Sequence, residues 1–147
     1  MSELEETEKE IIAESSKCIY IEKQIQINEI LRYYEYETHN EKWDNAKKSS
    51  YIQSIILSYP FSPFLLMEFG ENYVIIDGNE RTKSIIDFVN GNLRVKLKKE
   101  KKSKSIDYDS LSLSRRNQIM RKNLTALVLN ESTNSDTLYE IYNSLNV

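Results

Sequence analysis

Residues 75–81 read Ile75-Ile76-Asp77-Gly78-Asn79-Glu80-Arg81, and the change of character within this stretch decides the fold. The residues from 73 to 76 predict a buried strand, because a short apolar run bounded by turn residues is typical of one. Asp77-Gly78-Asn79 predicts a sharp corner, since glycine tolerates backbone dihedral angles that other residues avoid. A helix over about 80–90 follows and ends at Asn90-Gly91-Asn92. The sequence thus predicts a strand–turn–helix unit.

This corner also has the chemistry of an anion site. The first backbone N–H groups of a helix have no partners within it, and together with the helix dipole they attract phosphate. Gly78 lets a ligand approach the backbone, and Arg81 can clamp phosphate oxygens with its planar guanidinium group. Lys83 and Ser84 offer a further charge and a hydroxyl. We therefore expect a phosphate to bind here.

Two carboxylates accompany this predicted site. Asp77 and Glu80 do not bind phosphate directly, but either can hold a magnesium ion that bridges to phosphate oxygens, and Asp77 is our candidate metal ligand. One of them can instead position a water molecule as a base. The alternative is structural: Asp77 caps the helix, Gly78 makes the turn, and Glu80 and Arg81 are solvated.

The hydrophobic pattern on both sides of the corner predicts further helices and strands. Asn28, Asp44 and either Asp109 or Ser110 are suited to begin three of the helices, because their side chains can cap exposed N–H groups. Proline cannot continue a helix, so the Tyr59–Pro63 segment is expected to end the one before it. Helices are predicted over 3–16, 28–35, 45–58, 109–122 and 137–145, strands over 19–27, 64–69, 93–98 and 124–129, a loop over 36–40, and a solvated basic loop over 99–105.

The composition is that of a soluble globular protein with one domain. The chain has 147 residues, of which 39% are hydrophobic and 29% are charged. No apolar run approaches the roughly 20 residues that span a bilayer, and the acidic start does not resemble a secretory signal. Cys18 and His39 are the single cysteine and histidine, which argues against a disulfide framework and a zinc site. A reducing, cytoplasmic location is the expectation.

Charge is distributed unevenly, although the net charge is only −3. The first 14 residues carry six glutamates, whereas residues 94–104 form a basic run interrupted only by Glu100. Local fields of this kind can attract a partner even when the net charge does not. Two interpretations stay open for this run: a solvated hairpin, or a surface that contacts DNA. Its basic residues are Arg94, Lys96, Lys98, Lys99, Lys101, Lys102 and Lys104.

The ordered set of motifs resembles the N-terminal domain of GmrSD-type modification-dependent restriction proteins, a branch of the ParB/sulfiredoxin-like superfamily. That family carries a strand ending in Asp-Gly-Gln-Gln-Arg before a helix, and residues 77–81 are similar to it. Trp43, the helical segment 52–57 and the Pro60-Phe61-Ser62-Pro63 turn fit the family's order and spacing. The resemblance implies an α+β fold, a single small domain with a mixed sheet flanked by helices over 19–147, preceded by an acidic helical leader over 1–18.

For the site, the resemblance implies a nucleoside triphosphate with Mg²⁺ as the ligand. Asp77, Glu80 and Arg81 would be the catalytic residues, and Gly78 and Asn79 would shape the phosphate cradle. Two departures from the family pattern stand out: Thr38-His39 replaces the usual Gln-Arg before the tryptophan, and Glu80 replaces a glutamine. Both are compatible with altered chemistry or with lost activity.

Three functions are compatible with the sequence. The first is an NTP-binding domain of a protein associated with restriction, defence or a mobile element, with weak NTP hydrolysis as an extension. The second is a catalytically degenerate domain that binds DNA or a defence protein as a regulator or decoy, for example in viral counter-defence. The third is a metal-dependent DNA nuclease using Asp77 or Glu80. None requires a membrane, and the sequence leaves the oligomeric state open.

Overall fold

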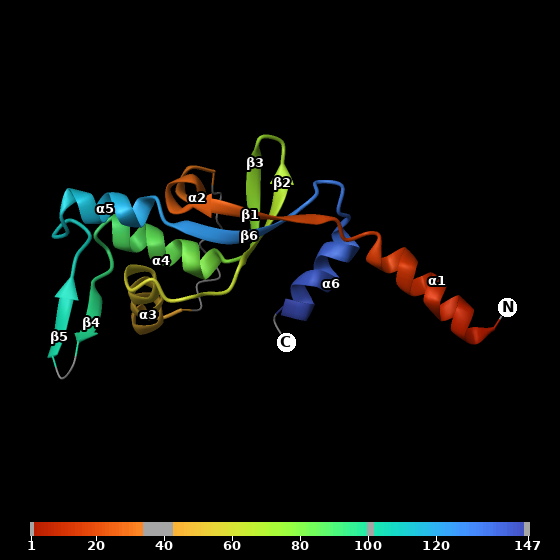
Figure 1. The fold of residues 1–147 in the computed structure, drawn as a ribbon, viewed down its shortest axis with the longest axis horizontal. Coiled ribbons are helices and arrows are strands. Elements are labelled where there is room, and N and C mark those ends of the chain that lie inside the picture. The colour runs from red at the N-terminus through yellow and green to blue at the C-terminus, as the bar shows by residue number, and fades with distance from the viewer. Residues whose placement is uncertain (1, 34–42, 100–101, 146–147) are drawn as a thin grey trace.

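Figure 1 shows the fold in a computed structural model, which describes residues 2–33, 43–99 and 102–145. The loop predicted over 36–40 and the Thr38-His39 pair lie outside these ranges. No helix within them is long and apolar enough to cross a membrane. The elements are α1 (Glu3–Ser15), β1 (Tyr20–Gln26), α2 (Ile27–Tyr33), α3 (Asn45–Ile56), β2 (Phe64–Phe69), β3 (Asn72–Asp77), α4 (Asn79–Val89), β4 (Val95–Lys99), β5 (Lys102–Ile106), α5 (Leu113–Met120), β6 (Asn123–Leu129) and α6 (Ser135–Leu145).

A four-stranded sheet in the order β1-β6-β2-β3 organises the body of the domain. β1 pairs antiparallel with β6, β6 runs parallel to β2, and β2 forms an antiparallel hairpin with β3. Helices α2, α3 and α4 lie beside this sheet in Figure 1, and β4 and β5 form a separate antiparallel hairpin. The predicted α+β class, with a mixed sheet flanked by helices, is confirmed.

The core forms where alternate residues of the central strands meet the apolar faces of the helices. In β6 the buried positions alternate, as expected for a strand with one face on the core. Each large side chain removed from water in this way contributes about 1.5–3 kcal/mol to folding. The core includes Phe64 and Leu66 of β2, Leu124, Ala126 and Val128 of β6, Ile52 and Ile55 of α3, and Ile85 and Phe88 of α4.

Helix α3 is held at both ends by side chains. The predicted cap is confirmed, because the Asp44 carboxylate accepts the N–H of Lys47 at 2.9 Å. The helix ends at Ile56, before the prolines, since Ser58 takes a positive φ of 59° and brings the N–H of Tyr59 onto the carbonyl of Ser54. Its exposed end is closed by Lys122, whose Nζ donates to the carbonyl oxygen of Ile55 at 2.7 Å and to Ser58 Oγ at 2.6 Å.

Two predicted helix starts are wrong. α2 begins at Ile27 rather than after a cap at Asn28, because the N–H of Ile27 already donates to the carbonyl of Lys122 on the neighbouring connection. α5 begins at Leu113 rather than at Asp109 or Ser110. The Ser110 hydroxyl closes a turn with the backbone of Asp107, so the cap passes to Ser112, which accepts the N–H of Arg115 at 3.2 Å.

The basic loop predicted over 99–105 is also wrong, because most of it is strand. Residues 102–106 form β5, which pairs with β4 from Val95 opposite Ile106 to Lys99 opposite Lys102. The lysine and serine residues of β5 carry almost no hydrophobic alternation. β5 is therefore a strand because its backbone pairs with β4. Its side-chain pattern alone does not predict a strand there.

Replacing Lys122 with methionine tests the closure of α3. The change keeps most of the side-chain volume but removes both hydrogen bonds to the helix end, leaving a part-buried carbonyl oxygen without its donor. We expect the free energy of unfolding, measured by urea titration, to fall by about 1–2 kcal/mol. The exposed neighbour supplies the control, since Arg121→Met should change it by less than about 0.5 kcal/mol. Equal losses of unfolding free energy in the two variants would show that Lys122 does not stabilise the end of α3.

Candidate functional site

The predicted corner is present, and its backbone requires glycine. β3 ends at Asp77, α4 begins at Asn79, and Gly78 between them has a φ of 129°. A Cβ atom on residue 78 would lie 2.5 Å from Cδ2 of Phe64, a fully buried side chain. Both the dihedral angle and the aromatic ring therefore exclude a larger residue.

Helix α4 starts without a side-chain cap. Gly78 makes no capping hydrogen bond, whereas Ser2, Asp44 and Ser112 each accept a backbone N–H at the start of α1, α3 and α5. The Asp77 carboxylate does not take the capping role predicted in the structural alternative. No N-cap side chain therefore occupies the first N–H groups of α4, which an anion can approach, although Glu80 in the first turn adds a negative charge there.

Arg81 is the most constrained side chain of the corner, and only 11% of it is exposed. Its guanidinium group donates to the carbonyl oxygens of Ser62 at 2.5 Å and Pro63 at 3.3 Å, and it lies 4.4 Å from the centre of the Phe64 ring. It also donates to Asp77 Oδ2 at 3.3 Å. Arg81 therefore joins the end of β3 to the turn that enters β2, and it is not the solvated residue of the structural alternative.

The two carboxylates have different surroundings. The side chain of Asp77 is 38% exposed and contacts Arg81. Glu80 instead accepts the backbone N–H of Trp43 at 3.2 Å, which connects α4 to the segment before α3. No group of three or more acidic, histidine or cysteine side chains suited to a metal occurs among the described residues. A single exposed carboxylate beside phosphate oxygens is nevertheless a usual magnesium environment, so Asp77 fits that metal.

The side chains of Lys83 and Ser84 make contacts within α4 and not at the corner. Lys83 forms an ion pair with Asp87 at 3.2 Å, and the same carboxylate receives Nζ of the buried Lys48 of α3 at 3.0 Å. Ser84 is completely buried, and its hydroxyl donates to the carbonyl of Glu80 at 2.8 Å. The structure thus brings together Asp77, Gly78, Asn79, Glu80 and Arg81 but places the Lys83 and Ser84 side chains in the packing of α4.

An aromatic cluster beside the corner was not predicted. Tyr51 packs edge-on against Trp43 at 5.9 Å and against Phe61 at 6.0 Å between ring centres. Burial raises the pKa of the Tyr51 hydroxyl above its ordinary value, so this group stays protonated at neutral pH. Its oxygen is buried and has no hydrogen-bond partner among the described residues. Trp43 precedes the N-cap of α3, so no helical spacing indicated its contact with Tyr51, and the approach of Phe61 depends on the turn that Arg81 holds.

Most of the predicted DNA-binding residues belong to the β4–β5 hairpin, and Arg94 directly precedes it. Lys96 and Lys104 are exposed, and Arg94 pairs through two hydrogen bonds of 2.7 and 3.2 Å with Asp107, whose pKa the guanidinium lowers. Lys98, Lys99 and Lys102 belong to the paired strands. Lys101 lies outside the described residues. The hairpin thus carries exposed positive charge, although Arg94 is already engaged.

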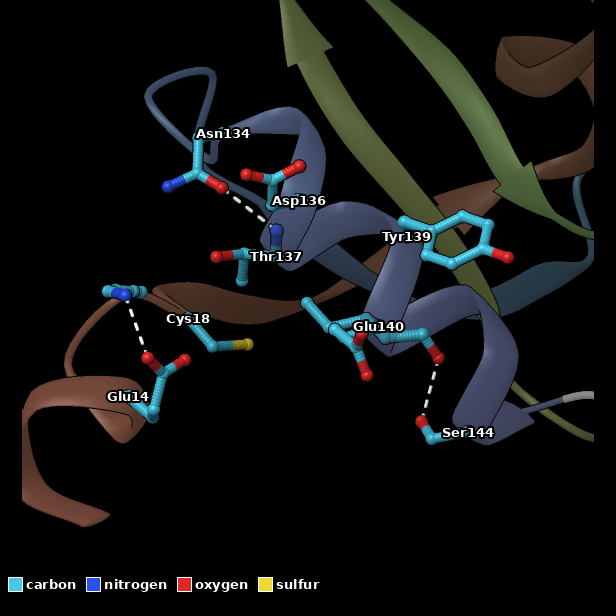
Figure 2. A pocket seen from close by; sticks show the side chains of 10 residues that line it. Glu14, Cys18, Asn134, Asp136, Thr137, Tyr139, Glu140 and Ser144 are labelled. Atoms are coloured by element: carbon cyan, nitrogen blue, oxygen red, sulfur yellow. Dashed lines mark hydrogen bonds and ion pairs between the residues drawn. The ribbon is translucent and has the colours of Figure 1, made fainter. Parts of the chain in front are cut away.

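A pocket of about 580 Å³ lies elsewhere, between the end of α1 and helix α6. Figure 2 shows that Cys18 and Glu14 face Asp136, Thr137 and Glu140 across it. Its polar groups make local contacts: Lys17 pairs with Glu14, Asn134 accepts the N–H of Thr137, and Ser144 donates to the carbonyl of Ile141. None of residues 77–84 lines it, so it is separate from the predicted site.

Comparison with known proteins connects the corner to one family. A family model described as the N-terminal domain of GmrSD restriction endonuclease matches residues 39–147. No curated protein and no solved structure gives a significant match. The match covers the corner, the basic hairpin and the aromatic cluster, whereas the ParB/sulfiredoxin-like relationship and the domain boundary between residues 18 and 19 stay predictions.

Replacing Gly78 with alanine tests the geometry of the corner. The new methyl group meets the Phe64 ring and the φ of 129° becomes strained, so we expect a loss of about 3 kcal/mol in unfolding free energy. Gly91→Ala is the matched control, because φ is also positive there at 81° but no atom lies within 4 Å of the added Cβ. The control should lose only about 1 kcal/mol, the cost of the left-handed backbone alone. Equal losses in urea titrations would show that the Phe64 contact is unimportant.

Proposed function

Because the chain belongs to the family of the N-terminal domain of GmrSD restriction endonucleases, we propose that it serves a restriction or defence system by binding a nucleoside triphosphate at the Asp77–Arg81 corner. The observation that carries this proposal is the uncapped start of α4 directly after the exposed carboxylate of Asp77. Phosphate oxygens favour such a helix start, and magnesium favours a carboxylate beside them.

Each residue has a separate part in this proposal. The triphosphate lies at the N-terminus of α4, with Gly78 and Asn79 forming the turn beneath it. Asp77 holds the magnesium ion, which neutralises phosphate charge when bound. Arg81 is a positioning residue, since it orients Asp77 and fixes the turn at Ser62 and Pro63. Glu80 anchors the chain at Trp43.

We propose binding as the main activity and hydrolysis as a slow extension of it. Phosphoryl transfer depends on positioned positive charge around the transferred group. Arg81 already donates to Ser62, Pro63 and Asp77, and Lys83 is paired with Asp87. A nuclease centre would have to rest on Asp77 and Glu80, and Glu80 accepts the N–H of Trp43, so we do not propose one.

Calorimetric titration with ATP, GTP and CTP tests the nucleotide proposal. We expect magnesium-dependent binding by the native protein and at least a tenfold weaker affinity, about 1.4 kcal/mol, in Asp77→Asn. Without magnesium the same variant should bind as well as the native protein or better, because it removes a negative charge near phosphate. Asp109→Asn, an exposed site in another turn, is the control. No binding of any triphosphate by the native protein overturns the proposal.

A second candidate function is DNA binding by the β4–β5 hairpin. Figure 1 shows this hairpin projecting from one end of the molecule, and it forms a sheet of its own with the exposed Lys96 and Lys104. β4 and β5 together contain five lysines and no acidic residue, a composition that attracts a polyanion. This favours a regulator or decoy that contacts the phosphate backbone.

Fluorescence anisotropy with duplex DNA measures this second function. Affinity should fall steeply with salt, because each neutralised phosphate contributes about −0.9 to the slope of log K against log salt. Lys96→Glu with Lys104→Glu should weaken binding and flatten that slope by about 2. Lys17→Glu, on an exposed lysine at the end of α1, should leave both unchanged. Absence of binding at low salt would exclude this function.

A further inference from the structure

Helix α1 has an apolar stripe that stays largely exposed in the described part of the chain. None of its residues is buried, and Leu4, Ile11 and Ile12 are 68%, 61% and 67% exposed. Figure 1 shows the helix projecting from one end of the molecule. A helix of 13 residues is only marginally stable in water without such packing. Its regular structure is therefore best explained by a contact with a partner.

The partner of α1 must be basic. Glu3, Glu6, Glu10 and Glu14 recur at helical spacing and share one face next to the apolar stripe. Residues 3–14 contain six glutamates and one lysine, a net charge of −5. Two copies of α1 packed against each other would bring like charges together, which disfavours a symmetric contact between the helices. The acidic face instead favours a positively charged surface.

The chain itself offers a surface of the required charge at its other end. The strands β4 and β5 contain five lysines and no acidic residue, a charge opposite to that of α1. Lys96 and Lys104 are exposed on the β4–β5 hairpin. Helix α5 follows this hairpin and begins with Leu113, which is 66% exposed, and Arg115 is exposed in its first turn. An apolar contact thus accompanies the positive charge.

We propose that α1 of one copy docks on the β4–β5 hairpin and the start of α5 of a second copy. The two surfaces lie at opposite ends of the long axis of the molecule in Figure 1, so α1 does not reach the hairpin of its own chain. The contact is therefore head-to-tail, and repetition gives a ring or an open row of copies. Its charges are exposed, so association depends on ionic strength.

Sedimentation equilibrium of the nucleic-acid-free full chain tests this proposal. At about 0.05 M salt the average mass should rise above 17.3 kDa with protein concentration. At about 1 M salt, where the Debye length is about 3 Å, the mass should return to that of one chain. A salt-resistant dimer or a monomer under all conditions overturns the proposal. The nucleotide site is not part of this contact. If the nucleotide proposal is wrong, the expected association of the chains is therefore unchanged.

Charge reversal identifies the two surfaces. One variant carries Glu3→Lys, Glu6→Lys and Glu10→Lys, and another carries Lys96→Glu and Lys104→Glu; each should be monomeric by itself. A mixture of the two should associate again, because the native helix of the second variant can dock on the native hairpin of the first. Glu71→Lys with Glu131→Lys, on exposed turns, is the control and should associate as the native protein does. Association of either reversed variant alone, or none in the mixture, overturns the proposal.

Discussion

The contact between Phe64, Gly78 and Arg81 is the constraint on which the rest of the domain depends. The Phe64 ring is completely buried at the start of β2, the backbone of Gly78 passes too close to it for a side chain, and the Arg81 guanidinium covers it at 4.4 Å. One ring thereby fixes the entry to β2 and the exit from β3. Arg81 adds hydrogen bonds to Ser62 and Pro63, so the turn before β2 and the start of α4 are held as one unit.

A second set of polar contacts joins α4 to α3 and to the segment before α3. Asp87 of α4 receives the ammonium groups of both Lys83 and the buried Lys48 of α3. Glu80 fixes the backbone at Trp43, just before α3 begins. Removing one partner of a buried ion pair leaves an uncompensated charge, so α3 and α4 are expected to keep their relative position. The corner is consequently rigid, which suits a site that depends on oriented backbone dipoles.

The two strongly charged segments of the chain lie mostly outside its hydrophobic core. The acidic residues of α1 and the basic residues of the β4–β5 hairpin lie outside the core and at opposite ends of the molecule. Helix α1 contributes no buried residue, whereas β4 contributes only its first residue, Val95, to the core. The charged side chains of these two segments therefore contribute to the electric field at the surface and not to the core.

The sequence by itself determined the strand–turn–helix corner and the cap at Asp44, because these depend on neighbouring residues and local backbone preferences, and its resemblance to a known family gave the α+β class. It also indicated the family through the Asp77–Arg81 motif. Only the tertiary structure decided that β5 is a strand, that Ser112 rather than Ser110 caps α5, and that Arg81 is held by Ser62 and Pro63. Each of these depends on which backbone groups find partners across space. Local sequence does not specify which distant backbone groups pair. It also does not show whether a side chain such as Arg81 binds a ligand or holds its own fold together.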